Sequence, residues 1–382
     1  MSHTGFTGAT VDTRLTALFA PGVGTPLASS SALRLMTGSI AGHHVLVAAT
    51  DPHADKGVLG IAECADLRRT VQMARESRTP LVLLIDSAGA RLDDGLPIQG
   101  ALRGLMRELL DASLDGLPSI ALLGRNVFGG ASMLAFATSQ RCYAPTTLLA
   151  MSGPRVLQAG GGDERAIVIE AIDGMARSRH GDTERLLDDS LTAYADALRD
   201  WLVAHSLDAP AASIAAERRH LAQRLSTAPQ PVTAAIEFEP AQGPLSCRGQ
   251  AFVGTTDVLK LATLAEAASG PLTLHLDCAG HSVRLGDERL ILSQYLVHLA
   301  KTLRQRVRAG QPVNLTIAGE ISGGIYIAAA GAASTVRIAP GGSVRTLPQS
   351  SLDNILNRPA AASADFAHYV EFGVADTVSP QP

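Results

Sequence analysis

The hydrophobic positions of this chain describe one order of structural elements twice. Apolar runs at residues 81–85 and 272–276 are each followed by a short turn of small residues, which includes Gly89 in one copy and Gly280 in the other. Apolar runs that end at glycine are typical of buried strands. The copies lie about 190 residues apart, a separation that leaves room for each to form its own domain.

A helix and a second strand are predicted after each turn. Residues 102–110 and 292–303 carry apolar side chains at spacings of three and four, the pattern of an amphipathic helix. The apolar runs 120–123 and 315–318 then lead to two glycine pairs and alanine-rich stretches. Strands joined by helices pair in parallel through right-handed crossovers. The sequence therefore predicts an α/β fold of two similar halves, with chance richness in alanine and glycine as the alternative.

The segment between the copies predicts the domain boundary. Two amphipathic helical stretches, 186–205 and 211–225, precede the proline-rich segment 228–231. Proline-rich segments are typical of linkers. We expect an N-terminal domain at 1–205, a helical and proline-rich linker at 206–240, and a C-terminal domain at 241–382.

Charge and cysteine usage exclude several classes of protein. The formal net charge is −4 and no basic cluster alternates with aromatic residues, which argues against nucleic-acid binding. The cysteines Cys64, Cys142, Cys247 and Cys278 lie far apart, which argues against a metal site or a disulfide framework. No secretory signal begins the chain, and no apolar run reaches the length of a membrane helix. We expect a cytoplasmic protein.

The two glycine pairs are the candidate chemistry. Gly129-Gly130 and Gly323-Gly324 each stand between a predicted strand and a predicted helix. The first N–H groups of a helix have no internal partners, and glycine lets an anionic oxygen approach them closely. Fixed donors of this kind stabilise the oxyanion of a thioester enolate. Tight packing of helix on sheet is the alternative reason for a glycine pair.

A second donor is expected from the turn that follows the first strand of each copy. Ala88 and Gly89 supply it in the first half, and Gly280 in the second. Two N–H groups would then hold one oxygen. Phe128 and Ser322, which directly precede the glycine pairs, would line the same sites.

Residues 81–187 resemble the β subunit of biotin-independent malonate decarboxylase, in the carboxyltransferase branch of the crotonase superfamily. The shared features are Leu84-Ile85-Asp86-Ser87-Ala88-Gly89-Ala90-Arg91-Leu92, Gly116-Leu117-Pro118, Phe128-Gly129-Gly130 and Met151-Ser152-Gly153-Pro154. Residues 245–378 are similar to the γ subunit through 319–324 and 339–342. The resemblance implies two crotonase-like half-domains, a β and a γ unit fused in one chain.

This resemblance also implies a reaction. In that family the β–γ unit decarboxylates malonyl carried on the phosphopantetheine arm of an acyl carrier protein, without biotin or metal, and we expect no tightly bound cofactor here. We therefore expect a malonyl or substituted malonyl substrate, a carrier protein or CoA thioester as partner, and a homo-oligomer of two or more chains. A carboxyltransferase, hydrolase or acyltransferase of acyl thioesters remains open, as does a non-catalytic thioester-binding protein.

Side chains near the glycine pairs complete the candidate site. Glu320 stands three residues before its pair and is a candidate proton donor, although an exposed loop carboxylate is the simpler interpretation. Ser132 and Tyr326, in the first helical turns, would bind carboxylate or pack the helices.

Three arginines and one histidine flank the turns and glycine pairs. Arg91, Arg125 and Arg155 suit coenzyme phosphates or an acidic carrier protein, with surface ion pairing as the alternative. His281 follows the second turn and is either a general acid or a solvated loop histidine.

Overall fold

The computed structural model describes residues 5–20, 22–161, 163–181, 183–205, 213–228, 245–247, 252–347 and 366–379. These residues form two compact units. Unit 1 comprises the described residues within 1–90, 111–154 and 163–212, and unit 2 those within 91–110, 155–162 and 213–382. Most of the expected linker, 206–212 and 229–240, lies outside the described residues.

Unit 1 is built on a mostly parallel sheet. Its strand order is β1-β2-β3-β4-β5-β6-β8, with β7 also paired to β5. The first pairings, β1 with β2 and β2 with β3, are antiparallel, and all later ones are parallel. The predicted strands at 81–85 and 120–123 are confirmed as β4 and β5. The bounds are β1 Thr25–Leu27, β2 Leu33–Ile40, β3 His43–Thr50, β4 Leu81–Ser87, β5 Ser119–Phe128, β6 Gln140–Tyr143, β7 Leu148–Ala150 and β8 Glu184–Leu186.

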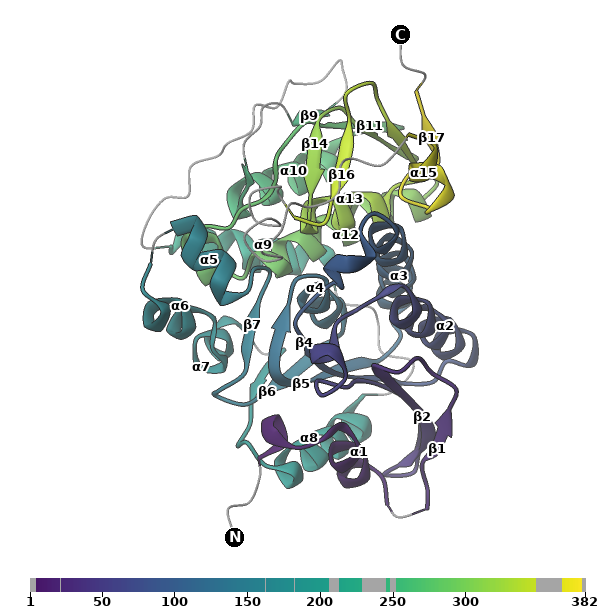
Figure 1. The fold of residues 1–382 in the computed structure, drawn as a ribbon, viewed down its shortest axis with the longest axis vertical. Helices are drawn as coiled ribbons and strands as arrows, with labels where there is room; N and C mark the ends of the chain where they lie inside the picture. Colours follow the sequence, from purple (N-terminus) through teal and green to yellow (C-terminus); the bar gives the residue numbers. More distant parts are fainter. Residues whose placement is uncertain are drawn as a thin grey trace. The chain divides into compact units, whose positions relative to one another are not determined.

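Helices cover this sheet because its strands carry apolar side chains on both faces. The helices α1 (Val11–Leu18) and α8 (Leu191–Ala204) lie side by side on one face, where their apolar residues pack on Val82, Leu84 and Leu122 (Figure 1). Helix α2 (Ile61–Ser77) contacts β3, and α4 (Gly130–Ala137) contacts β4 and β5. The shorter helices α6 (Arg165–Ile172) and α7 (Gly174–Arg177) adjoin β7.

Unit 2 contains a five-stranded parallel sheet in the order β17-β15-β13-β11-β9. Two small parallel pairs, β10 with β12 and β14 with β16, accompany it. The bounds are β9 Leu245–Cys247, β10 Phe252–Val253, β11 Leu272–Leu276, β12 Gly280–His281, β13 Val313–Ile317, β14 Glu320–Ser322, β15 Thr335–Ile338, β16 Ser343–Arg345 and β17 Thr377–Val378. Its helices are α5 Pro154–Gly161, α9 Ile214–Ser226, α10 Thr255–Ala267, α11 Leu285–Arg289, α12 Leu292–Arg308, α13 Gly324–Ala332 and α15 Phe366–Glu371.

Helix α3 (Pro97–Leu114) follows β4 in sequence, but its residues up to Leu110 belong to unit 2. Two of its arginines explain this assignment. Arg103 donates to the carbonyl of Ala330 at 3.2 Å, and Arg107 donates to the carbonyl of Gly331 at 3.2 Å. Both therefore satisfy carbonyl groups at the C-terminal end of α13, which have no partners within the helix. The amphipathic pattern predicted this helix but not the unit that it joins.

The structure extends the internal repeat beyond the predicted elements. Gly60 precedes α2 and Gly254 precedes α10, with nearly the same backbone angles, φ −95° and −98°. Each glycine donates its N–H to an acidic side chain three residues later, Glu63 or Asp257. These matching caps, together with the parallel sheets, agree with the predicted plan of two similar α/β halves.

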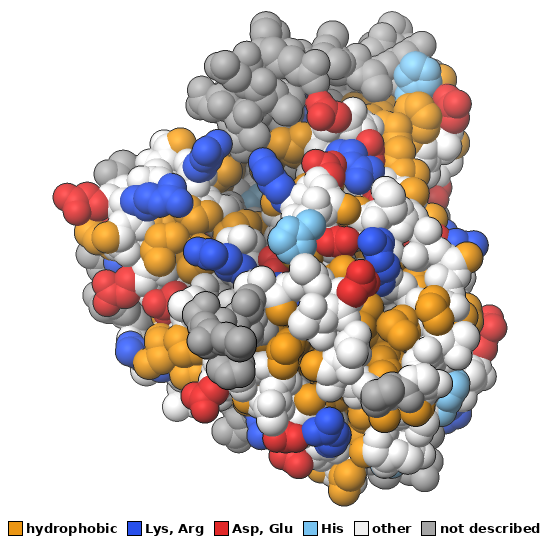
Figure 2. Space-filling model, turned by 60° about the horizontal axis from the view of Figure 1, so that its bottom comes forward, with side chains coloured by type: hydrophobic (Ala, Val, Ile, Leu, Met, Phe, Trp, Pro, Cys, Tyr) orange, Lys and Arg blue, Asp and Glu red, His pale blue; other side chains and the backbone are white. Residues whose placement is uncertain are grey.

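The surface carries charges of both signs. On the face drawn in Figure 2, basic, acidic and hydrophobic side chains are interspersed. Within the described ranges, none of the helices has the length and apolar character needed to cross a membrane.

Candidate functional site

The first glycine of each pair has a backbone conformation that side chains disfavour. Gly129 has φ 60° and ψ −133°, and Gly323 has φ 65° and ψ −143°. Both N–H groups are already bonded: Gly129 donates to the carbonyls of Ala150 and Met151 at 3.3 and 3.1 Å, and Gly323 to that of Arg345 at 3.3 Å. These two residues therefore turn the chain into the helix but do not offer the donors that the sequence predicted.

The second glycine of the first pair carries the available donor in unit 1. Gly130 is the first residue of α4, and its N–H has no acceptor among the described residues. It lies at the positive end of the helix dipole, where an anionic oxygen is stabilised. Gly130 is therefore the main-chain group in unit 1 that best fits an oxyanion.

The turn after β4 packs against this glycine pair. Gly89 has φ 107°, and a Cβ there would lie 3.2 Å from the carbonyl oxygen of Phe128. Ala88, which is exposed, donates its N–H to Lys56 at 3.1 Å, and Gly89 donates to the Ser87 hydroxyl at 3.1 Å. The next N–H, of Ala90, has no acceptor in the described part of the chain. The second donor expected from Ala88 or Gly89 is thus better assigned to Ala90.

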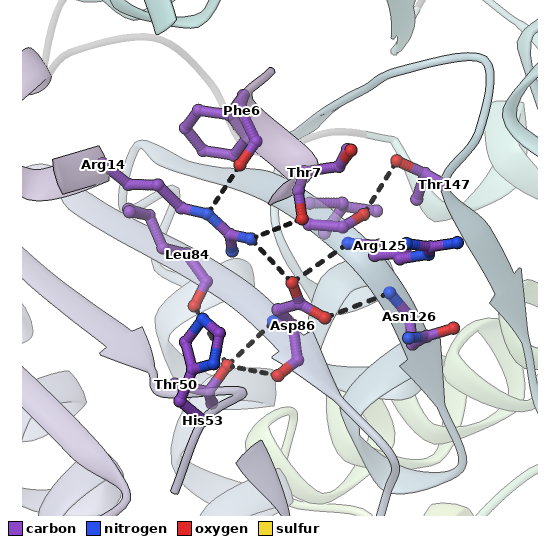
Figure 3. A network of polar contacts seen from close by, with 12 residues as sticks. Phe6, Thr7, Arg14, Thr50, His53, Leu84, Asp86, Arg125, Asn126 and Thr147 are labelled. Carbon is purple, nitrogen blue, oxygen red and sulfur yellow. Dashed lines mark hydrogen bonds and ion pairs between the residues drawn. The ribbon is translucent and has the colours of Figure 1, made fainter. Parts of the chain in front are cut away.

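A buried carboxylate holds the end of β5 just before the glycine pair (Figure 3). Asp86 accepts hydrogen bonds from the backbone N–H groups of Arg125 and Asn126, each at 3.1 Å. It also pairs with the Arg14 guanidinium at 2.8 Å, and both side chains are almost fully buried. The pairing of β4 with β5 is irregular at this point. Asp86 therefore fixes the backbone that leads into Gly129. A lone carboxylate at the end of an apolar run was its only signal in the sequence.

The second half repeats the geometry but not the open donor. Gly280 has φ 136° and packs against Ser322, whose hydroxyl donates to the carbonyl of Ala279 at 2.8 Å. The N–H of Gly324 donates to Nδ1 of His281 at 3.0 Å. His281 is 2% exposed, so it is not a solvated loop histidine. Burial lowers its pKa from 6.5 to about 4, opposed by a hydrogen bond with the Ser322 backbone.

Ser132 and Tyr326 have structural partners. The Ser132 hydroxyl donates to the carbonyl of Gly129 at 2.7 Å, and the Tyr326 hydroxyl donates to that of Val374 at 2.7 Å. Both side chains are fully buried, and burial raises the pKa of Tyr326. These contacts favour the helix-packing interpretation over carboxylate binding.

The charged candidates lie nearer the surface. Glu320, in β14, pairs with Arg345 at 3.0 Å and has a side chain 45% exposed. Arg125 and Arg155 are exposed, while Arg91 is partly buried and lies 3.9 Å from Asp94. Phe128 is partly buried beside Gly153. The hydrogen bond from Arg345 and the exposure of Glu320 fit the simpler interpretation, an exposed carboxylate, better than a proton donor.

Part of the chain is similar to a known family of domains. Residues 25–177, from β1 to α7, match the sequence model of the carboxyl transferase domain. The propionyl-CoA carboxylase beta chain of Rhodococcus erythropolis is 29% identical over 153 residues, which are 40% of this chain and 32% of that protein. The acetyl-coenzyme A carboxylase carboxyl transferase subunit beta of Prosthecochloris aestuarii is 27% identical over 130 residues, 34% of this chain and 47% of that protein.

These matches span a third to a half of the relatives' own length. Among solved structures, a Pseudomonas malonate decarboxylase hetero-tetramer in complex with malonate is similar, with a TM-score of 0.53, 20% identity, and coverage of 60% of this chain and 95% of that chain. The expected crotonase-like carboxyltransferase fold is confirmed. The sequence relatives, however, are subunits of carboxylases, so the similarity to a decarboxylase is one of fold.

Proposed function

We propose that this chain is an enzyme that decarboxylates a malonyl or substituted malonyl thioester. The observation that carries the proposal is the unpartnered N–H of Gly130 at the start of α4, beside a turn whose Ala90 N–H is also unpartnered among the described residues. Both groups would donate to the thioester oxygen. The coarser assignment, to carboxyl transferase chemistry on acyl thioesters, is supported by the match at 25–177.

The chemistry follows from where charge develops. The bond between the α-carbon and the carboxylate breaks, carbon dioxide leaves, and the electron pair passes into a thioester enolate. Its negative oxygen is stabilised by donors that are already in place before reaction, each worth about 3 kcal/mol of barrier. Water then protonates the α-carbon. Since Glu320 is an exposed carboxylate that already accepts a hydrogen bond from Arg345, we propose solvent as the proton source in its place.

The proposal also covers the carrier and the assembly. Arg91, Arg125 and Arg155 would bind the phosphates of coenzyme A or of the phosphopantetheine arm of an acyl carrier protein. We propose a cytoplasmic homo-oligomer that uses neither biotin nor a tightly bound cofactor.

Carboxyl transfer is the second candidate, favoured by the named functions of the sequence relatives, a propionyl-CoA carboxylase chain and an acetyl-CoA carboxylase carboxyl transferase subunit. It differs in that the carboxyl group passes to an acceptor and carbon dioxide is not released.

The test removes one N–H donor from the site. Proline is tolerated at the first position of a helix and lacks an N–H, so Gly130→Pro deletes the proposed donor, while Gly130→Ala retains it. With malonyl-CoA or malonyl carrier protein we expect release of carbon dioxide. Gly130→Pro should lower kcat by about 100- to 1,000-fold relative to Gly130→Ala.

Mass spectrometry of the products separates the alternatives. Acetyl thioester carrying one solvent deuterium in D2O supports decarboxylation, free thiol indicates hydrolysis, and a carboxylated biotin derivative indicates carboxyl transfer. Thermal unfolding checks that both variants are folded. A folded Gly130→Pro enzyme with the activity of Gly130→Ala would refute the assigned donor.

A further inference from the structure

The two halves place different side chains at one position. In unit 1, Leu59 and Ala90 form a parallel bridge, and in unit 2 the same bridge joins Val253 and His281. Each bridge links the residues before the capping glycine of a helix to the turn after a buried strand. The repeat therefore aligns His281 with Ala90, just as it aligns Gly324 with Gly130.

His281 places an imidazole ring at the position where unit 1 has the methyl group of Ala90. Its Nδ1 accepts the Gly324 N–H at 3.0 Å. The ring lies against Gly323, where a Cβ would be 2.3 Å from Nδ1 and 2.4 Å from Cε1. A nitrogen that accepts a hydrogen bond carries no proton, so the neutral ring holds its proton on Nε2. Since Gly323 donates to Arg345, both N–H groups of this pair are bonded within the protein.

We propose that His281 closes the second glycine-pair site, so that, within the described residues, the pair at Gly129-Gly130 is the one of the two that can hold an oxyanion. His281 is thereby a specificity-determining residue. The inference rests on the proposed function in one respect, because the reaction that His281 would select is the proposed decarboxylation.

A single open site favours one outcome of the chemistry. Decarboxylation forms one enolate: the carbon–carbon bond breaks, carbon dioxide leaves, and water supplies the proton. Transfer of the carboxyl group to a second thioester needs a second enolate to attack it, and that enolate's oxygen also requires donors. With the Gly324 N–H bonded to His281 and the Gly323 N–H bonded to Arg345, the glycine pair of unit 2 does not supply them. The chain should therefore release carbon dioxide and not transfer the carboxyl group to a second thioester.

Two substitutions at His281 separate closure from simple packing. His281→Ala copies the first half and frees the Gly324 N–H. In His281→Asn, the amide oxygen can accept the same N–H in nearly the same place and keep the site closed. All forms carry Gly130→Pro, which removes the donor in unit 1, so a response to a small anion reports on unit 2.

Formate is the probe, and thermal unfolding is the readout, because a ligand that binds the folded state raises its melting temperature. We expect formate to raise the Tm of His281→Ala by at least about 2 °C over equal chloride, and to leave His281 and His281→Asn unchanged. Imidazole should compete with formate in His281→Ala. An equal formate response in all three forms, or none in a folded His281→Ala protein, would overturn the closure.

Nitrogen NMR of the protein without substitution gives a test independent of variant folding. At neutral pH we expect one tautomer of His281, with an unprotonated Nδ1 and a protonated Nε2. A rapidly exchanging tautomer mixture would contradict the geometry.

The selected reaction has its own measurement. Malonyl-CoA is incubated with labelled acetyl-CoA, and labelled malonyl-CoA would reveal carboxyl transfer between thioesters. We expect none. Its formation would overturn the selection by His281, whereas an absence of carbon dioxide release would count against the proposed function and leave the formate result standing.

Discussion

Removal of the Asp86 carboxylate should destabilise unit 1 by breaking a buried network (Figure 3). Asp86 is 3% exposed and its partner Arg14 is 2% exposed. Breaking a buried pair by removal of one partner typically costs about 3–5 kcal/mol, because the other charge stays buried. Arg14 keeps two acceptors, the carbonyls of Phe6 and Thr7 at 2.8 and 2.9 Å. We therefore expect the lower end, about 3 kcal/mol, for Asp86→Ala.

The loss should also reach the site. Without Asp86, the N–H groups of Arg125 and Asn126 lose their acceptor, and the backbone that precedes Gly129 is no longer fixed. We expect a lower kcat in Asp86→Ala under conditions where the protein is folded. Asp86→Asn retains an oxygen acceptor and the shape of the side chain, so its effect should be smaller.

Urea unfolding, followed by circular dichroism, measures the free energy of unfolding. The matched control is Asp196→Ala, whose ion pair with Arg199 is exposed, 46% for the arginine and 58% for the aspartate side chain. Exposed pairs contribute about 0–1 kcal/mol. If the free energy of unfolding of Asp86→Ala lies within about 1 kcal/mol of that of the unmodified protein, the network does not stabilise the end of the strand as its burial indicates.

Three further changes test the geometry of the glycine pairs. The pKa of His281 is about 4 in the folded state against an ordinary 6.5, so the unfolded chain binds more protons between these pH values. The contribution of neutral His281 to stability is therefore complete above pH 6.5 and is lost as the pH falls to 4, a loss of about 3 kcal/mol. The free energy of unfolding should depend less steeply on pH in His281→Asn. Gly323→Ala should lower Tm more than Gly341→Ala, since both glycines have positive φ but only at Gly323 would a Cβ meet a neighbour closer than 3 Å; equal losses would mean that His281 moves aside freely. Ala90→His should place an imidazole beside Gly130 and reduce carbon dioxide release by about 100-fold, while Ala90→Ser should not; a folded Ala90→His protein with full activity would show that the turn is not part of the site.

The order of elements was predictable because hydrophobic spacing and glycine report local geometry. The strands at 81–85 and 272–276 and the helices opening at Gly130 and Gly324 are where the pattern indicated. The local sequence does not determine which N–H groups at the start of a helix are hydrogen-bonded to other parts of the protein. Gly129 is bonded by carbonyls of residues some twenty positions later, at Ala150 and Met151, and such tertiary partners leave no periodic signal.

Side-chain roles were harder to predict for the same reason. Ser132 and Tyr326 stand where a substrate carboxylate could be bound, but their hydroxyl groups meet backbone carbonyls. A polar residue in an apolar helix indicates only that some partner exists. The helix at 97–114 is similar: its leucines predict a buried face, and only the contacts of Arg103 and Arg107 reveal that it packs in unit 2.

The internal repeat allows corresponding residues of the two halves to be compared. The pairs share positive φ at Gly129 and Gly323, and the turns share positive φ at Gly89 and Gly280, so the backbone was kept in both copies. A backbone that glycine alone adopts readily is retained when something depends on it. In unit 1 that dependence is an open N–H, and in unit 2 it is the seat of His281, because any side chain at Gly323 would displace the ring. The same backbone plan therefore has two outcomes: the Gly130 N–H has no acceptor among the described residues, as the proposed chemistry requires, whereas the Gly324 N–H bonds to the buried His281 ring.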